Sequence, residues 1–192
     1  MPSQQTEQNN PLLATAYSRA RMVAFGGSTM HIRRATVKDY RELIAVDRLA
    51  RSSRDRKLSL RRAIAEQAAY VLVQRDCLLA YAILRRSFFH RPFVEMLYVA
   101  ETERRKGYGE LLLARLEAKG LQHAEIWTST NRSNKPMRRL LKKRGFMFTG
   151  RVCRLDKGDA ELFYCKKRPN KINPPPPGPR LHAHARSDVY QP

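Results

Sequence analysis

Hydrophobic positions between about residues 29 and 168 alternate between the two-residue period of strands and the three-to-four-residue period of helices. Strand-like runs cover residues 30–35, 70–74, 78–85, 93–100, 124–130, 146–155 and 161–167, and helical runs cover residues 37–47, 59–67, 109–119 and 134–144. The polar break at Arg75-Asp76-Cys77 between two apolar runs indicates a β-hairpin. This alternation predicts one α/β domain built around a mixed sheet.

The two ends of the chain lack this pattern. Residues 1–28 are polar or mixed, so we expect an N-terminal extension that is partly disordered, with a short helix over residues 12–25. Residues 169–192 are rich in proline and contain few core-forming side chains, which predicts a disordered, basic, extended tail. The domain is therefore expected at residues 29–168. No apolar run is long enough to span a bilayer, and the polar start has no signal-peptide core, so we expect a cytoplasmic protein without membrane contact.

The segment with the clearest chemistry is the basic glycine loop that runs from Arg104 to Gly109. It joins the predicted strand over residues 93–100 to the helix that follows. Gly107 and Gly109 allow a tight bend and close approach to a ligand, and the start of the helix points free amides at the same place. Together with the positive helix end, these groups form an anion site suited to a pyrophosphate. Neither the P-loop nor the dinucleotide fingerprint fits the glycine spacing.

This loop and its surroundings resemble the GNAT superfamily of N-acetyltransferases. The family motif Gln/Arg-x-x-Gly-x-Gly/Ala is matched by Arg104, Gly107 and Gly109, and Asn134 and Gly145-Phe146 follow in family order. The resemblance covers about residues 30–168. It implies a GNAT-like mixed, mostly antiparallel central sheet flanked by helices, in which the fourth and fifth predicted strands (93–100 and 124–130) splay apart.

The resemblance also implies acetyl-CoA as the acyl donor and a set of residues that bind it. The pantetheine arm would pair with the backbone of the fourth strand, the loop amides would hold the pyrophosphate, and Asn134 would bond the pantetheine side. The expected cofactor-binding residues are Leu97, Tyr98, Val99, Arg104, Arg105, Lys106, Gly107, Tyr108, Gly109, Glu110 and Asn134. Asn134 precedes Lys135-Pro136, so it also suits the N-cap of the next helix, and both roles are compatible.

Direct acetyl transfer needs a base to take a proton from the amine, and Glu95 is the candidate. It lies two residues before Leu97 and four before Val99, which predicts that the three side chains share one strand face. The alternative is that Glu95 pairs with one of the many arginines. The general-acid tyrosine of the family falls at Leu141, which cannot donate a proton. Either Tyr98, Tyr108 or Tyr164 replaces it, or the thiolate leaves without an acid.

The charge balance points to an anionic partner, because 38 Lys and Arg residues face 17 Asp and Glu residues and give a net charge of +21. The cations cluster at Arg48, Arg51, Arg54, Arg56, Lys57, Arg61 and Arg62, and at Arg138, Arg139, Lys142, Lys143 and Arg144. Such a surface would repel polyamines and aminoglycosides. We therefore expect the acceptor amine on an acidic protein or on RNA, as in the aminoacyl-tRNA-modifying toxins of the same family.

Two further alternatives remain open at the level of sequence. One is a weakly catalytic or non-catalytic acyl-CoA-binding module that binds nucleic acid, which the leucine at position 141 favours. The other concerns assembly, since the sequence does not fix the oligomeric state and allows a homodimer. The cysteines Cys77, Cys153 and Cys165 show no metal-binding or disulfide spacing, so we expect no metal site and reduced thiols.

Overall fold

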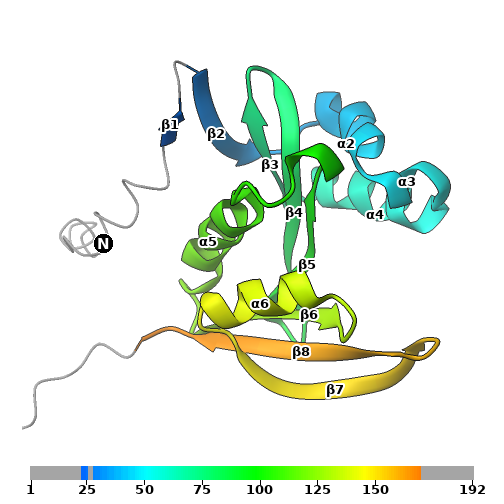
Figure 1. The fold of residues 1–192 in the computed structure, drawn as a ribbon, viewed down its shortest axis with the longest axis vertical. Helices are drawn as coiled ribbons and strands as arrows, with labels where there is room; N and C mark the ends of the chain where they lie inside the picture. The colour runs from blue at the N-terminus through cyan, green and yellow to red at the C-terminus, as the bar shows by residue number, and fades with distance from the viewer. Residues whose placement is uncertain (1–22, 26–27, 170–192) are drawn as a thin grey trace, which may run out of the picture.

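A sheet with the strand order β1-β2-β3-β4-β5-β6-β8-β7 runs through the molecule, with helices on both of its faces (Figure 1). The computed structural model describes residues 23–25 and 28–169. The expected disordered ends, and most of the helix expected over residues 12–25, lie outside the described residues. At Val23–Phe25 that helix prediction is wrong, because these residues form a strand that pairs antiparallel with β2.

The elements largely follow the predicted order. They are β1 (Val23–Phe25), β2 (Ser28–Arg34), a 3₁₀ helix η1 (Val37–Asp39), α2 (Tyr40–Val46), α3 (Arg48–Ser52), α4 (Arg54–Ala65), β3 (Ala69–Gln74), β4 (Cys77–Phe88), β5 (Arg91–Val99), a 3₁₀ helix η2 (Glu101–Glu103), α5 (Tyr108–Gly120), β6 (Glu125–Asn131), α6 (Lys135–Lys143), β7 (Met147–Asp156) and β8 (Asp159–Lys167).

All neighbouring strands are antiparallel except β5 and β6, which are parallel and pair only at Phe93–Trp127 and Val94–Thr128. Beyond Val94 the two strands part. The predicted fold is confirmed on both counts, because the sheet is mixed and mostly antiparallel, and its fourth and fifth predicted strands splay. In the part of the chain that the structure describes, no strand pairs with the β6-facing edge of β5 from residue 95 to residue 99.

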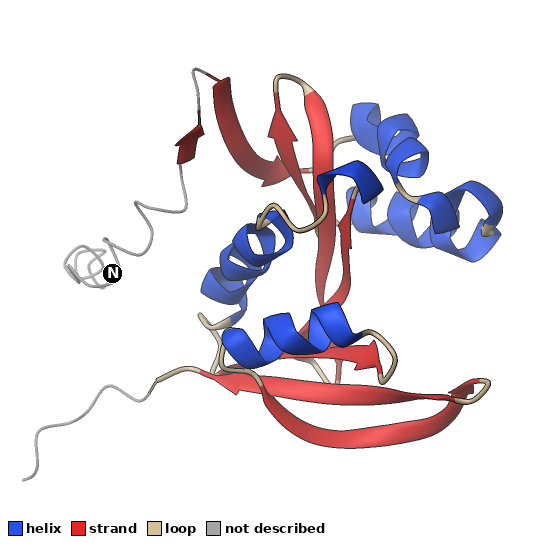
Figure 2. Cartoon of the chain, in the orientation of Figure 1, coloured by secondary structure: helices blue, strands red, loops and turns tan. Residues whose placement is uncertain are grey.

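The two faces of the sheet carry different helices and separate hydrophobic clusters (Figure 2). On one face α5 and α6 pack over the first cluster, which includes Leu112, Leu116 and Leu141. On the other face α2, α3 and α4 pack over the second cluster, which includes Leu43 and Leu60. The gap in pairing between β5 and β6 therefore lies between an α5–α6 side and an α2–α4 side of the sheet.

The first helical region is more broken than its hydrophobic pattern suggests. The expected helix over residues 37–47 is a 3₁₀ turn followed by α2, and the chain becomes extended at Asp47, whose φ is −89° and ψ is 102°. Asp47 then caps α3, which had not been predicted, and Ser53 caps α4, which starts earlier than expected. Side-chain caps thus override the helical periodicity here.

Candidate functional site

The glycine loop enters α5 through two residues with left-handed backbones. Arg105 has a φ of 65°, and Gly107, the N-cap residue of α5, has a φ of 85°. The Leu111 amide donates to the Gly107 carbonyl at 3.0 Å and so closes the first turn. Among the described residues, the amides from position 105 to position 110 have no backbone acceptor, as expected ahead of a first helical turn. The loop therefore presents a run of free N–H groups at a positive helix end.

Gly109 places this helix end directly on the end of β5. A Cβ atom at this position would lie 3.4 Å from Val99 Cγ2 and 4.0 Å from Leu97 Cδ2. A side chain larger than a methyl group would therefore push α5 away from β5. These contacts fit a cofactor that passes from the loop amides to the open edge of β5, because glycine keeps the two features adjacent.

Carboxylates pair with two of the three cations of the loop. Lys106 Nζ lies 3.0 Å from Glu103, and Arg104 lies 3.7 Å from Glu101. Arg105 has no ion-pair partner in the part of the chain that the structure describes, and all three cations are exposed. Their charge is thus available to an anion in front of the loop.

The three β5 residues expected to meet the pantetheine arm face two sides. Leu97 and Val99 pack toward the α5–α6 cluster, whereas Tyr98 packs toward the α2–α4 cluster. The Thr128 hydroxyl donates to the Val94 carbonyl at 2.9 Å and closes the gap at its narrow end. Backbone groups past this bond face the gap without a β6 partner, and buried peptide groups need such partners.

Asn134 is the N-cap of α6, as the sequence indicated. Its Oδ1 accepts from the Met137 amide at 3.2 Å, and its Nδ2 donates to Thr130 Oγ1 at 3.0 Å. An amide nitrogen carries two N–H groups, so one donor remains for a ligand. The capping role is confirmed, and the cofactor role stays a prediction that this geometry permits.

Glu95 occupies a β-bulge, and this changes the direction of its side chain. Opposite β5, Ile83 pairs with Met96 and Leu84 pairs with Val94, so Glu95 has no partner on β4. The expectation that Glu95 shares a face with Leu97 and Val99 is wrong, because the extra residue shifts the alternation. Its carboxylate lies on the α2–α4 side.

Two side chains on β4 donate hydrogen bonds to the Glu95 carboxylate. Arg85 Nη1 donates to its Oε2, and the Ser87 hydroxyl donates to its Oε1 at 2.6 Å. The same guanidinium donates to Glu66 at 2.6 Å, so Arg85 joins β5 to the end of α4. The arginine pairing that the sequence left as an alternative is present. The side chain of Glu95 is still 23% exposed, and its oxygens keep lone pairs that these two donors do not occupy.

No acid stands at the usual position, because Leu141 is fully buried in the α5–α6 core. Of the three candidate tyrosines, Tyr98 accepts a hydrogen bond from the Arg48 amide at 3.2 Å, and Tyr108 lies in the first turn of α5. Tyr164 is buried beside Leu141 and pairs with Thr128, the β6 residue at the narrow end of the gap.

A buried ionic cluster fixes the helices of the α2–α4 side, and sequence reasoning had missed it. Asp47 is fully buried and accepts from Tyr81 Oη at 2.5 Å and from Arg56 Nε at 2.6 Å. Burial raises the pKa of Tyr81 above its usual value, so this hydroxyl remains a donor. Arg56 is therefore committed to a structural contact and does not belong to the free basic surface.

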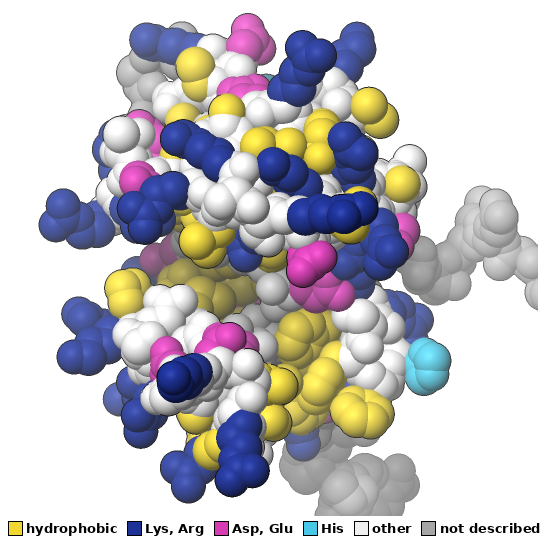
Figure 3. Space-filling model, turned by 90° about the vertical axis from the view of Figure 1, so that its right-hand side faces the viewer, with side chains coloured by type: hydrophobic (Ala, Val, Ile, Leu, Met, Phe, Trp, Pro, Cys, Tyr) yellow, Lys and Arg dark blue, Asp and Glu magenta, His cyan; other side chains and the backbone are white. Residues whose placement is uncertain are grey.

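The remaining cations of this region are mostly exposed, and Figure 3 shows Lys and Arg side chains crowded over the helices of the α2–α4 side. In the same view a hollow with hydrophobic side chains lies below them. The exposed cations are Arg48, Arg51, Arg54, Arg61 and Arg62, with Lys57 partly exposed.

The fold and the loop together define a class of acetyl-CoA-dependent acyltransferases. The model of the acetyltransferase (GNAT) family matches residues 33–146, and the chain belongs to that family. It is a GNAT-type N-acetyltransferase with acetyl-CoA as acyl donor. None of the curated protein sequences matches this chain.

Several solved structures share the fold. A GNAT-family acetyltransferase from Bacillus cereus ATCC 10987 is 25% identical with a TM-score of 0.65, over 72% of this chain and 97% of that one. The ribosomal-protein-S18-alanine N-acetyltransferase from Escherichia coli is 16% identical with a TM-score of 0.63, over 72% and 93%. The PaiA N-acetyltransferase from Thermoplasma acidophilum, solved with coenzyme A, is 20% identical with a TM-score of 0.57, over 72% and 99%. No helix in the described part of the chain is long and apolar enough to cross a membrane.

Proposed function

We propose that this enzyme transfers the acetyl group directly to a primary amine on an anionic macromolecule, either a protein or an RNA-linked amine such as that of aminoacyl-tRNA. The observation that carries the proposal is the gap beyond the Val94–Thr128 pair. It lies between the glycine loop, which would bind the anion, on the α5–α6 side, and the Glu95 carboxylate and the basic surface on the α2–α4 side. Donor and acceptor can therefore approach from opposite faces.

Acetyl-CoA supplies the acetyl thioester in this scheme. The free amides of residues 105–110 would bind its pyrophosphate, and Arg105 would add an unpaired positive charge. The open edge of β5 at residues 97–99 would pair with the amide groups of the pantetheine arm, and the spare N–H of Asn134 would bond to the same arm. We place the N-acetyltransferase domain that contains this site at residues 29–168.

Glu95 would accept the proton that the attacking amine loses. The nitrogen attacks the carbonyl carbon, an N–C bond forms, the C–S bond breaks, and the electron pair leaves with the thiolate. A backbone N–H on the open edge of β5 would stabilise the developing oxyanion. Arg85 and Ser87 would hold the carboxylate toward the acceptor side. Since Leu141 cannot donate, the thiolate leaves without help from that position.

The acceptor class follows from the charge around the hollow. Exposed arginines at positions 48, 51, 54, 61 and 62 lie on the helices beside it. Cations at this density raise the local concentration of anionic partners and lose that effect as salt increases. The ribosomal-protein-alanine N-acetyltransferases among the structural neighbours support a macromolecular amine as acceptor. The alternative of a non-catalytic module is not favoured, because the donor elements are intact.

A matched pair of variants tests the base. We expect Glu95→Gln to lower kcat by about 10²-fold or more, with little change in the KM for acetyl-CoA. Glu66→Gln is the control, because Glu66 binds the same guanidinium from α4 and lies outside β5. Thiol release with an accepted amine substrate measures both. Equal losses in the two variants would assign Glu95 a structural role through Arg85.

A screen identifies the acceptor and separates the two macromolecular classes. Thiol release is measured with ribosomal and acidic cell proteins, with N-terminal peptides and with charged tRNA, at low and at physiological salt. Replacing Arg54, Arg61 and Arg62 by Ser should raise the acceptor KM and flatten its salt dependence. Absence of turnover with every pool, together with intact acetyl-CoA binding, would support the non-catalytic alternative instead.

A further inference from the structure

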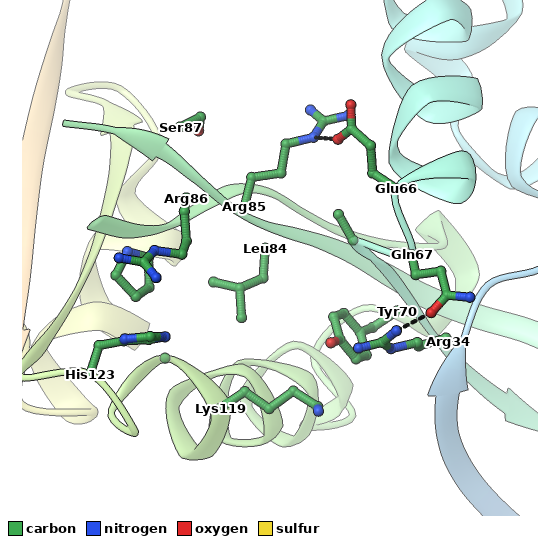
Figure 4. Close-up of a pocket in the computed structure, with 13 residues that line it drawn as sticks. Arg34, Glu66, Gln67, Tyr70, Leu84, Arg85, Arg86, Ser87, Lys119 and His123 are labelled. Atoms are coloured by element: carbon green, nitrogen blue, oxygen red, sulfur yellow. Dashed lines mark hydrogen bonds and ion pairs between the residues drawn. The ribbon is translucent and has the colours of Figure 1, made fainter. Parts of the chain in front are cut away.

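A second cavity lies at the end of the sheet away from the glycine loop. Its volume is about 620 Å³, and it opens between the C-terminal end of α5, the start of β5 and the turn that follows α4 (Figure 4). Pro92 at the start of β5 lines this cavity, whereas the loop follows Val99 at the other end. At about 3.3 Å per residue, some 20 Å of strand separates the two sites. The cavity is therefore not part of the acetyl-CoA site.

Three cations line this cavity without a carboxylate partner among the described residues. Arg34 donates to the side-chain oxygen of Gln67, and Arg86 donates to the carbonyl of His90 at 3.0 Å. Lys119 Nζ lies 5.7 Å from the centre of the Tyr70 ring. In Figure 4 these side chains stand around Leu84 from three different elements. These contacts are with neutral groups, so no carboxylate among the described residues offsets the three charges.

The single acidic side chain of the lining does not neutralise them. Glu66 is bound to Arg85, at 2.6 Å, and Arg85 also binds Glu95. Arg34 and Arg86 are exposed and Lys119 is partly exposed, and among the described residues none of them has a carboxylate within 3 Å, whereas Arg56, Arg144 and Lys166 each do. The cavity thus concentrates uncompensated positive charge at a place where several segments converge, and like charges repel unless an anion joins them.

The volume and the lining of the cavity indicate which class of ligand it can bind. A volume of 620 Å³ lies in the range of pockets for small organic molecules. Leu84 and the Tyr70 ring offer an apolar surface, and guanidinium groups match phosphate oxygens in geometry. A site of this limited size suits a free small molecule better than a nucleic-acid strand, whose backbone needs a continuous track.

We propose that this cavity binds a small phosphate-bearing molecule with a planar or apolar part. The phosphate would lie among Arg34, Arg86 and Lys119, and the apolar part would pack on Leu84 and Tyr70. This site lies apart from the glycine loop, although Arg85 and Ser87, which bind Glu95, also line it. Its occupancy can be measured by binding, without turnover.

Calorimetry with adenosine 5′-monophosphate, pyrophosphate and inorganic phosphate tests the site. The full chain is first saturated with coenzyme A, so that the glycine loop cannot bind the probes. We expect adenosine 5′-monophosphate or pyrophosphate to bind, and Arg86→Gln with Lys119→Gln to weaken that binding at least tenfold. The control is Arg151→Gln with Lys157→Gln, which removes the same charge from exposed positions outside the cavity.

The calorimetric results distinguish binding in the cavity from binding elsewhere on the protein. Binding that survives coenzyme A, is lost in the cavity variant and is kept in the control supports the site. Equal weakening in both variants, loss of binding once coenzyme A is present, or binding of a single-stranded oligoribonucleotide but none of the three probes would each overturn it. Thermal melting of both variants, with midpoints close to the parent, confirms that the comparison concerns folded protein.

Discussion

Replacing Asp47 by Ala should destabilise the domain more than any change at the surface. Asp47 is fully buried at the end of α2, and its carboxylate accepts hydrogen bonds from residues of α3, α4 and β4. Its Oδ1 accepts from the amides of Leu49 and Ala50, at 2.9 and 3.3 Å, and its Oδ2 accepts from Tyr81 and Arg56. Alanine removes every one of these acceptors and leaves three kinds of donor behind.

The expected loss in the free energy of unfolding is the sum of the contributions of these contacts. Loss of the α3 cap costs about 1 kcal/mol. The buried Tyr81 hydroxyl, left without an acceptor, costs about 1–3 kcal/mol. Breaking a fully buried ion pair costs about 3–5 kcal/mol, but Arg56 is 23% exposed and recovers part of its hydration, so we take about 1–2 kcal/mol. The expected loss is about 4 kcal/mol, a large part of the stability of an ordinary domain.

Urea denaturation followed by tryptophan fluorescence and circular dichroism measures this loss. Asp55→Ala is the control, because Asp55 is exposed on α4 and should change the free energy of unfolding by less than about 1 kcal/mol. Adding Arg56→Met to Asp47→Ala should recover about 1 kcal/mol by removing the unpaired cation. A loss below about 1 kcal/mol, or one equal to that of Asp55→Ala, would refute the reasoning.

Three further predictions concern single positions. Gly107→Ala should cost about 1–2 kcal/mol in urea denaturation, because φ is 85° while a Cβ atom would meet nothing within 4 Å; an unchanged midpoint would contradict a left-handed residue there. Gly120→Ala should cost about 1–3 kcal/mol despite better helix propensity, because its Cβ would lie 2.4 Å from Ile126 Cδ1, and Ile126→Val should restore part of that loss. The Arg33 hydrogen bond lowers the pKa of Asp39 from 3.8 to about 2, so the stability it adds is present above pH 4 and is lost as pH falls toward 2. Asp39→Asn should therefore be less stable than the parent by about 2 kcal/mol near neutral pH, and the difference in urea midpoints should vanish near pH 2.

The sequence predicts the glycine loop and the N-cap of α6 because their signals are local. Gly107 and Gly109 lie between an apolar strand and an apolar helix, and Asn134 precedes a proline, so each is recognisable within a few residues. The structure has each of them where it was expected.

The α2–α4 side of the sheet was less predictable because it depends on contacts between distant segments. Residues 93–99 are almost uniformly apolar, so alternation gives no sign of the bulge that redirects Glu95. Arg85 joins Glu66 and Glu95, which lie on different elements, and a charge-rich sequence offers many other pairings. The break of the helix at Asp47 likewise depends on Tyr81, which lies 34 residues further on.

The narrow contact between β5 and β6 has a consequence for the way this domain unfolds. Within the described residues, two residue pairs join the strands of the N-terminal part of the sheet to those of the C-terminal part. The segment between them in sequence contains the glycine loop and α5, whose Leu112 and Leu116 pack in one core with Val94 and Ile126. Helix α5 thus packs against both parts of the sheet and holds them together. Separation along this line would be the first large opening of the native state. Acetyl-CoA bound between β5 and β6 would stabilise the closed state against this opening. Amide exchange in β6 and β8 should therefore slow when acetyl-CoA binds.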